Sequence, residues 1–359
     1  MKIDAIHFYV EDARIWRDWF VHKMGFQSVA SGRENSTDTE VVTSGPIVFI
    51  LSSSLSPASP VAQYLRYHPP GVANVAFAVS NVDSVMEKAI AFGAKVLQPI
   101  QEIVRPEGKL RWCRIRSVAN LEHTLIERHG ITPILPNENI VETKVEEATT
   151  APFTGIDHLV LNVGLGELEE TIRWYEASFG FERQQTFTIQ TERSALYSQV
   201  MVHPVSGVKF PVNEPMSATS QIQEFLDVNC GPGIQHIALN TPNIVQKTAK
   251  LRQAGFSFLD VPLNYYTQLW ESYPKTHCLA TEWEDIIKQQ ILVDCQGDNQ
   301  GSDSNPLLLQ IFTQPIFEKP TFFFELIERR SQAEGFGEGN FRALFEAIER
   351  EQLKRGSLQ

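Results

Sequence analysis

The sequence predicts an α+β fold built from two similar halves, each with a sheet as its main element. Strand-like and helix-like segments recur in the same order in both halves. The tetrapeptide Leu-Ile-Glu-Arg occurs at residues 125–128 and again at residues 326–329. A chain of 359 residues is long enough to bury two separate cores. We therefore expect an N-terminal domain over residues 1–130, a linker over 131–152 and a C-terminal domain over 153–359.

Each half begins with a strand and an amphipathic helix. In the first half, apolar residues favour a strand over residues 4–10 and then recur at helical spacing over residues 12–24. Gly25 follows as a C-terminal stop. In the second half, the same pattern predicts a strand over residues 156–163 and a helix over residues 166–178.

Short β-rich stretches follow in both halves, and each half then continues with a central strand and a second helix. The strands are expected at residues 73–79 and 234–239, and the helices at residues 82–92 and 243–254. Each helix keeps its apolar residues on one face, which is typical of a helix that packs on a sheet.

Two stretches lack periodicity. Residues 130–154 are rich in Pro, Glu and Thr, and indicate a linker that crosses the surface. Residues 296–306 are rich in Gly, Asp, Asn and Ser, and indicate an exposed hairpin loop between two strands.

The C-terminal residues 340–355 predict an amphipathic helix. Its apolar residues follow the spacing i, i+3, i+4, i+7, namely Phe341, Leu344, Phe345 and Ile348. The preceding residues 335–339 contain three glycines, which adopt backbone angles that other residues resist. The helix is therefore either packed permanently on the core or a mobile lid, and the sequence favours neither.

The charge and the cysteines restrict the class of protein. A net charge of −12 argues against nucleic acid or an anionic membrane surface as a partner. No apolar stretch approaches the roughly 20 residues of a membrane span, and the first residues lead directly into a strand, so we expect no signal peptide. The cysteines have no CxxC spacing, which predicts free thiols in the cytoplasm: Cys113, Cys230, Cys278 and Cys295.

Comparing the two halves brings out candidate metal ligands. Aligning Leu-Ile-Glu-Arg places Thr124 opposite Glu325. Two similar pairs are Ile6-His7 with Ile156-Asp157-His158, and residues 71–76 with residues 233–238. The first half then offers His7, Asn74 and Thr124, and the second offers His158, His236 and Glu325. Two imidazoles and one carboxylate form the facial triad that holds non-haem Fe(II), whereas Thr and Asn are poor ligands for a transition metal.

Each member of this triad also has a simpler interpretation. A lone histidine in a strand, such as His158 or His236, is more often a hydrogen-bonded core residue, and strand alternation would point Asp157 away from His158. Glu325 lies in an apolar run, where a carboxylate needs water or a strong partner. That partner is either a metal or a nearby arginine. All three residues lie on corresponding strands of one half, and this favours a metal site over three separate structural roles.

These residues lie in stretches that match a known family in order and spacing over nearly all of residues 153–350. The matching stretches are Gly155–His158, Phe210–Pro215, Ser220–Gln223, Gly233–His236, Leu309–Thr313, Phe322–Arg329 and Gly335–Phe341. The chain resembles the vicinal oxygen chelate superfamily, and its second half resembles the 4-hydroxyphenylpyruvate dioxygenase family. The resemblance implies two vicinal-oxygen-chelate domains, each built from paired βαβββ modules that form an open barrel-like sheet. It also implies a C-terminal helix over the active site.

The resemblance also implies a reaction. The family uses Fe(II), and His158, His236 and Glu325 fall on its ligand positions. Its members convert 4-hydroxyphenylpyruvate and dioxygen to homogentisate and carbon dioxide by oxidative decarboxylation, ring hydroxylation and side-chain migration. The first half is then structural and without metal. The expected partners are the small-molecule substrate, dioxygen and further copies of the chain, with no nucleic acid and no membrane.

Pocket residues follow from the same resemblance. The polar positions around the substrate are Ser198, Asn213, Gln221, Gln235 and Gln310. The apolar wall comprises Phe312, Phe323, Phe336, Phe341 and Leu344, with Pro211 beside it. Pro211 and Pro215 are expected to shape a turn that presents Asn213. For each residue taken alone, a purely structural role is the alternative, and plain core is the stronger alternative for Phe323.

Three other functions share parts of this pattern. 4-Hydroxymandelate synthase uses the same substrate, iron and ligands, but it has a smaller aliphatic residue near Phe341 and hydroxylates the benzylic carbon. Phe341, with Ser198 and Asn213, favours ring hydroxylation. An extradiol dioxygenase would place a His or Tyr acid/base near the iron, and none can be assigned here. A non-catalytic small-molecule-binding protein of this fold would lack the triad.

Overall fold

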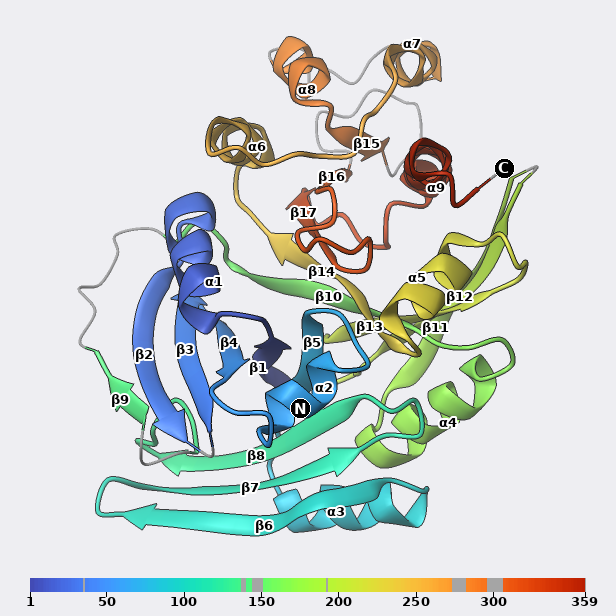
Figure 1. The fold of residues 1–359 in the computed structure, drawn as a ribbon. Coiled ribbons are helices and arrows are strands. Elements are labelled where there is room, and N and C mark those ends of the chain that lie inside the picture. Colours follow the sequence, from blue (N-terminus) through green and yellow to red (C-terminus); the bar gives the residue numbers. More distant parts are fainter. Residues whose placement is uncertain are drawn as a thin grey trace.

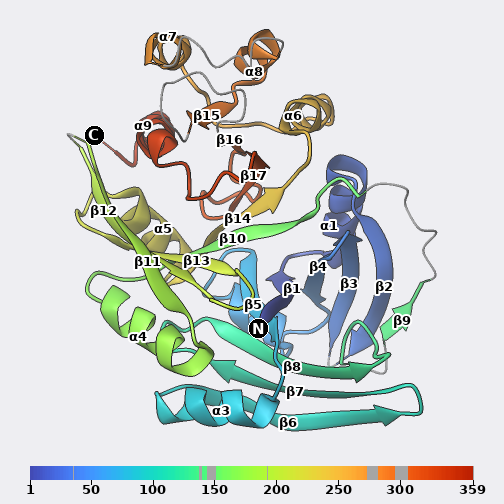
Figure 2. The ribbon, with the colours of Figure 1, turned by 180° about the vertical axis from the view of Figure 1, so that it is seen from behind.

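The computed structural model describes most of the chain and arranges it as two curled sheets with helices packed around them (Figures 1 and 2). The described residues are 1–34, 36–136, 140–143, 151–191, 193–272, 282–295 and 306–358. Their strands and helices confirm the predicted α+β class with two similar halves.

The described strands of the first half form one sheet in the order β6-β7-β8-β5-β1-β4-β3-β2-β9. Their bounds are β1 Lys2–Tyr9, β2 Gln27–Glu34, β3 Thr37–Ser44, β4 Ile47–Ser54, β5 Gly71–Ala78, β6 Lys95–Arg105, β7 Gly108–Arg116, β8 Glu122–Gly130 and β9 Ile140–Glu142. The helices here are α1 Ala13–Trp19, its π-helical continuation η1 Phe20–Met24, α2 Pro60–Leu65 and α3 Val82–Ala91.

The described strands of the second half form a sheet in the order β11-β12-β13-β10-β14-β17-β16-β15. Their bounds are β10 Gly155–Asn162, β11 Glu182–Gln190, β12 Ala195–Val202, β13 Lys209–Pro215, β14 Gly233–Asn240, β15 Leu292–Cys295, β16 Leu307–Phe312 and β17 Phe323–Arg330. The helices are α4 Leu168–Phe179, α5 Gln221–Asn229, α6 Ile244–Gln253, α7 Leu263–Ser272, α8 Trp283–Gln289 and α9 Glu338–Arg355.

The predicted elements are present with small shifts at their ends. The C-terminal helix α9 begins at Glu338, two residues before the predicted start. Strand β9 lies inside the predicted linker and pairs with β2, because a strand of three residues is too short to show a period. Strands β15 and β16 pair antiparallel, as expected for a hairpin, while residues 296–305 of the predicted loop lie outside the described residues.

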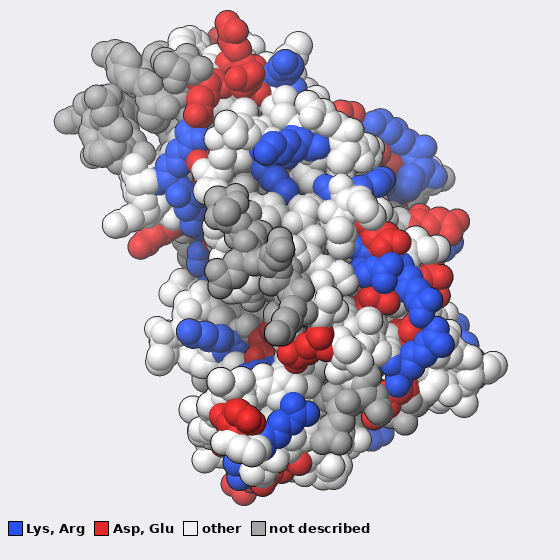
Figure 3. All heavy atoms as spheres, turned by 90° about the vertical axis from the view of Figure 1, so that its left-hand side faces the viewer, with Lys and Arg blue, Asp and Glu red and all other residues white. Residues whose placement is uncertain are grey.

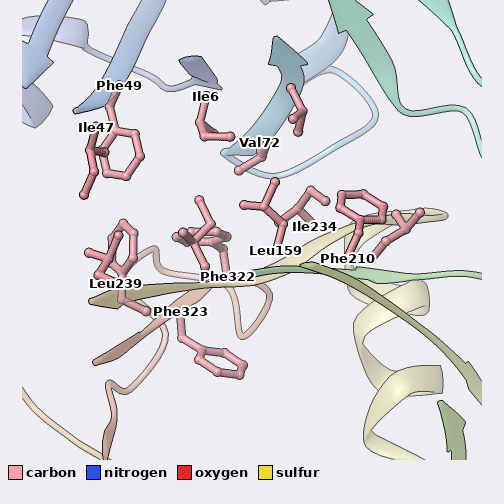
Figure 4. Packing of buried hydrophobic residues seen from close by; sticks show 14 of the residues in the cluster. Ile6, Ile47, Phe49, Val72, Leu159, Phe210, Ile234, Leu239, Phe322 and Phe323 are labelled. Atoms are coloured by element: carbon pink, nitrogen blue, oxygen red, sulfur yellow. The ribbon is translucent and has the colours of Figure 1, made fainter. Parts of the chain in front are cut away.

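The largest hydrophobic core lies between the two sheets and draws on both halves. Ring pairs cross the boundary, with centroids 5.3 Å apart for Phe8 and Phe322 and 6.0 Å apart for Phe49 and Phe324. Figure 4 shows Phe322 pointing toward the first half and Phe323 pointing away from it. The alternation along β17 therefore assigns one face to the core and leaves the other for a site.

The repeated Leu-Ile-Glu-Arg motif makes the same two contacts in both halves. Its glutamate accepts a hydrogen bond from the first helical amide nitrogen: Glu127 from Val82 at 2.8 Å, and Glu328 from Ile244 at 2.7 Å. A carboxylate is favourable at a helix N-terminus because the amides there have no helical partner. Its arginine forms a two-bond pair with an aspartate on the first strand of its own half, Arg128 with Asp4 and Arg329 with Asp157.

The remaining expectations concern the surface. Within the described residues, no helix is both long and apolar enough to cross a membrane. On the face drawn in Figure 3, the visible Lys and Arg side chains are interspersed with Asp and Glu. Cys113, Cys230 and Cys295 form no disulfide with one another, and Cys278 lies outside the described residues.

Candidate metal centre

The three candidate ligands lie on adjacent strands of the second sheet. His158 is on β10, His236 on β14 and Glu325 on β17. Their ligand atoms all lie within 4.8 Å of one another. Glu325 Oε2 is 3.2 Å from His158 Nε2 and 3.6 Å from His236 Nε2. The three side chains are buried, with Glu325 only 1% exposed, so the carboxylate needs a compensating partner.

A bulge in β10 brings Asp157 beside His158. The pairing of β10 with β14 shifts register between Ile156 and His158, which leaves Asp157 as the extra residue. Asp157 Oδ1 consequently accepts a hydrogen bond from His158 Nδ1 at 3.0 Å. The expectation that alternation separates these side chains is wrong for this reason. The first half has the same irregularity between Ile3 and Ala5.

The outer contacts orient both imidazoles toward Glu325. Asp157 is fixed by Arg329 and binds His158 Nδ1, while Gln235 Oε1 lies 3.2 Å from His236 Nδ1. When Nδ1 donates to an outer partner, Nε2 is the nitrogen that binds a metal once it has lost its proton. His236 also stacks on Phe323, with ring centroids 4.8 Å apart.

Burial and neighbouring charges both shift the pKa values of these groups. Burial lowers the pKa of His236 well below its ordinary value, and the neighbouring His158 lowers it further. Burial alone would lower the pKa of His158, but the carboxylates of Glu325 and Asp157 outweigh it and raise this pKa to about 9. Burial would raise the pKa of Asp157, but Arg329 and His158 hold it well below its usual range. Asp157 is therefore an anion that holds the imidazole in place.

In the first half, the register corrects one of the sequence pairings. Ala5 pairs with Ala76 as His158 pairs with Ala238, so the counterpart of His158 is Ala5 and not His7. The pairing of Thr124 with Ala76 matches that of Glu325 with Ala238, as the sequence predicted. The pairing of Ile6-His7 with Ile156-Asp157-His158 rested on local similarity and is wrong by two residues for His7.

The three polar side chains that the sequence singled out in the first half form hydrogen bonds within that half. His7 Nε2 lies 2.7 Å from Ser52 Oγ, and Thr124 Oγ1 donates to Asn74 Oδ1 at 3.1 Å. Across the described part of the chain, the triad of the second half is the one cluster of three or more potential ligands.

A cavity opens beside the triad, and its free space, including the mouth, is about 730 Å³. Every predicted pocket residue lines it together with the three candidate ligands: Ser198, Pro211, Asn213, Gln221, Gln235, Gln310, Phe312, Phe323, Phe336, Phe341 and Leu344. Its lining suits a small organic ligand, since such sites are mostly apolar with a few polar groups.

The polar residues of this cavity come from three sides. Asn213 donates to Asn162 Oδ1 at 3.2 Å, and Gln221 Oε1 is buried without a partner. Asn213 does not lie in a turn as predicted. Pro211 and Pro215 are both part of strand β13, which is held between β12 and β10. The tertiary pairing overrides the local turn preference of proline.

Helix α9 forms the remaining wall and is tied to Glu325 by a chain of hydrogen bonds. Gln310 Nε2 donates to Glu325 Oε1 at 2.9 Å and to the Phe336 carbonyl at 3.0 Å. Asn340 donates to Gln310 Oε1 at 2.8 Å, and the Tyr265 hydroxyl donates to Asn340 Oδ1 at 2.7 Å. The chain links the candidate ligand to α7 and α9.

Sequence reasoning missed Asp157, Arg329, Asn340 and Tyr265. Asp157 and Arg329 could have been found from the internal repeat, because Ile-Asp and the arginine of the tetrapeptide occur in both halves. No sequence pattern indicates the contact of Asn340 with Tyr265, since it joins residues 75 positions apart.

We expect Gly337→Ala to disturb both α9 and the triad. Gly337 has φ +78° and N-caps α9, and an added Cβ would collide with the Gln310 side-chain amide. Backbone strain alone costs about 1–3 kcal/mol. Thermal unfolding should show a lower midpoint, and equilibrium dialysis should show weaker metal binding. Gly356→Ala, with φ +76° and open space around its Cβ, is the control for strain alone. Equal metal affinity in both variants would contradict the proposed link between α9 and Glu325.

The two curled sheets and the triad on adjacent strands define a protein of the vicinal oxygen chelate class. A family model described as "Glyoxalase/Bleomycin resistance protein/Dioxygenase superfamily" matches residues 155–278. A second, described as "Hydroxyphenylpyruvate dioxygenase, HPPD, N-terminal", matches residues 2–131.

Similarity to individual proteins identifies the family within this class. The chain is 38% identical to a 4-hydroxyphenylpyruvate dioxygenase of Yarrowia lipolytica, over 99% of this chain and 93% of that protein. It is 37% identical to one from Caenorhabditis elegans, over 100% and 93%. A solved structure of a 4-hydroxymandelate synthase mutant from Streptomyces coelicolor superposes with a TM-score of 0.86 at 28% identity and covers 98% of both chains. The chain belongs to the 4-hydroxyphenylpyruvate dioxygenase family and is an enzyme of this dioxygenase type.

Proposed function

We propose that the chain binds Fe(II) through His158, His236 and Glu325 and converts 4-hydroxyphenylpyruvate and dioxygen to homogentisate and carbon dioxide. The observation that favours this most is the position of the triad. Two imidazole Nε2 atoms and one carboxylate converge within 4.8 Å beside a cavity that is largely apolar and contains several phenylalanines. The names of the curated relatives agree with this activity.

The donor set fits iron. Two neutral imidazoles and one carboxylate leave open positions on a divalent ion, and this is the pattern of non-haem Fe(II) oxygenases. Burial would lower the pKa of Arg329, but Asp157 and the charge of Glu325 raise it, and its guanidinium is hydrogen-bonded to Asp157 and not to Glu325. Bound Fe(II) would supply the electrons that activate dioxygen and the positions that hold an α-keto acid.

The protein then binds and orients the substrate. Phe312 and Phe323, whose ring centroids are 6.3 Å apart, offer faces for the aryl ring on the side of His236. The side-chain amides of Asn213, Gln221 and Gln235 can donate to or accept from a phenol without fixing its charge. Helix α9 covers the cavity and excludes water, which strengthens each polar contact inside.

Ring hydroxylation and benzylic hydroxylation are the two outcomes to separate, because the similar solved structure is a 4-hydroxymandelate synthase. Phe341 lines the cavity and packs edge-on against Phe187, with centroids 4.7 Å apart. This filled wall restricts where the ring of the substrate can lie. We take it as support for ring hydroxylation.

Phe341→Ala is expected to lower the yield of hydroxylated product per dioxygen consumed, because the ring loses one wall and water gains access. Decarboxylation takes place at the keto-acid end of the substrate and consumes dioxygen, but it does not involve the ring and should continue. The measurement compares oxygen uptake, carbon dioxide release and homogentisate in one reaction. Ala347→Gly is a packing control, since Ala347 is buried on the same helix and does not line the cavity. Coupled turnover in Phe341→Ala would show that this wall does not direct the chemistry.

The proposed function as a whole is tested by metal-dependent oxygen uptake. Metal-free protein, loaded anaerobically with Fe(II) or with Zn(II), is mixed with 4-hydroxyphenylpyruvate and dioxygen. Uptake with Fe(II) and none with Zn(II) supports the proposal, and no uptake with either contradicts it. Cytoplasmic location and homo-oligomeric assembly stay predictions from the sequence.

A further inference from the structure

The first half has a second and larger pocket, which the triad does not use. It lies between the sheet of the first half and two segments of the second, residues 229–234 and 321–322. Its free space, including the mouth, is about 1850 Å³. The two pockets share no lining residue.

The sheet register shows that this pocket corresponds to the surroundings of the metal centre. Arg114 pairs with Thr124 as Phe312 pairs with Glu325. Glu122 pairs with Asn74 as Phe323 pairs with His236. Two phenylalanines beside the triad are therefore replaced by an arginine and a glutamate in the first half. The pocket of the first half is therefore charged at the positions where the metal cavity of the second half is apolar.

Its charged residues leave a net positive charge. Arg114 Nη2 lies 2.7 Å from Glu122 Oε2, and Arg116 Nη2 lies 2.8 Å from Glu122 Oε1. One carboxylate thus serves two guanidinium groups, each of which has five N–H donors. The arginine side chains are 33% and 38% exposed, so a ligand can reach them. The local excess of positive charge favours binding of an anion here, although the net charge of the whole chain is −12.

Aromatic side chains lie at one end of the pocket's lining. Tyr9 and Tyr64 meet edge-on with centroids 5.3 Å apart, and Tyr64 stacks on His68 at 4.7 Å. Phe322 and Pro232 add apolar surface from the second half. Aromatic rings prefer to pack against such faces and edges.

We propose that this pocket binds a small aromatic carboxylate. The forked guanidinium groups of Arg114 and Arg116 match the geometry of a carboxylate. The aromatic end of the ligand then lies among Tyr9, Tyr64 and Phe322. Phe322, directly before β17, lines this pocket, and Phe323, the first residue of β17, lines the metal cavity, so the two sites lie on opposite sides of the start of β17 (Figure 4). The proposal goes beyond the proposed function and does not depend on it, because no metal ligand is involved.

The test uses 4-bromophenylacetate with the full chain. Calorimetric titration gives the affinity, and the anomalous signal of bromine in co-crystals gives the location. We expect a bromine peak beside Arg114. The double variant Arg114→Gln, Arg116→Gln should lose that peak and bind at this site roughly tenfold or more weakly, because charge-assisted hydrogen bonds are lost. Any peak in the metal cavity should remain.

Two further variants keep the result decisive even if the double variant does not fold. Glu122→Gln removes the carboxylate that competes for both guanidinium groups, so the affinity should rise. Arg173→Gln removes an arginine that is 74% exposed and pairs with Glu169 elsewhere, so the affinity should stay the same. A bromine peak in the metal cavity alone, a peak without measurable binding in solution, or weaker binding by Glu122→Gln would each overturn the proposal.

Discussion

Replacing Glu325 with Gln is expected to remove bound iron and nearly all activity. The carboxylate lies 3.2 Å and 3.6 Å from the two imidazole Nε2 atoms and is the one acidic member of the triad. An amide is a far weaker ligand and removes the negative charge. The loss should exceed the 10- to 100-fold effect that is typical of outer partners of a metal ligand. Iron per chain by elemental analysis and homogentisate by chromatography measure the two effects.

Glu328→Gln is the matched control, because Glu328 lies three residues along the same strand and is buried. Its carboxylate accepts from the Ile244 amide at the start of α6 and does not face the triad. The variant should lose about 0.5–2 kcal/mol of stability, as other helix N-caps do, and should keep its iron. Full iron content in Glu325→Gln would show that Glu325 is not a ligand.

Replacing Asp157 with Asn is expected to weaken iron binding and to destabilise the fold at once. Asp157 accepts from His158 Nδ1 and from two nitrogens of Arg329, and its side chain is only 5% exposed. Loss of an outer partner lowers metal affinity by about 10- to 100-fold. Breaking a buried ion pair leaves a charge without compensation and costs about 3–5 kcal/mol. Metal titration and chemical denaturation measure the two changes separately.

The internal repeat supplies the control for Asp157. Asp4 makes the same two-bond pair with Arg128 in the half that lacks the triad. Asp4→Asn should therefore reduce stability but leave iron affinity within about twofold, as expected for distant independent sites. Equal losses of iron affinity in the two variants would mean that Asp157 acts through general stability and not through His158.

Much of the fold could be predicted because its signals are local. The strand and helix pairs at the start of each half show in the spacing of apolar residues, and the tetrapeptide fixes the correspondence of Thr124 with Glu325. The three candidate ligands come from strands that lie side by side in the sheet. Their separation along the chain, 78 and 89 residues, is that of one module folded on itself.

What escaped prediction depends on tertiary structure. The bulge at Asp157 and the hydrogen bond from Asn340 to Gln310 arise from pairing between distant segments. Pro211 and Pro215 favour a turn locally, yet their strand is held by two neighbours. His7 matched a short pattern, and the sheet register alone shows that Ala5 takes the place of His158.

The identity of the product tests the central claim most directly. Protein loaded anaerobically with Fe(II) is given 4-hydroxyphenylpyruvate and dioxygen, and the products are separated by chromatography and identified by mass spectrometry. The account predicts homogentisate from the wild type and none from Glu325→Gln. 4-Hydroxymandelate would keep the iron site but contradict the assignment of the cavity wall, and the absence of any oxidised product would contradict the proposed function.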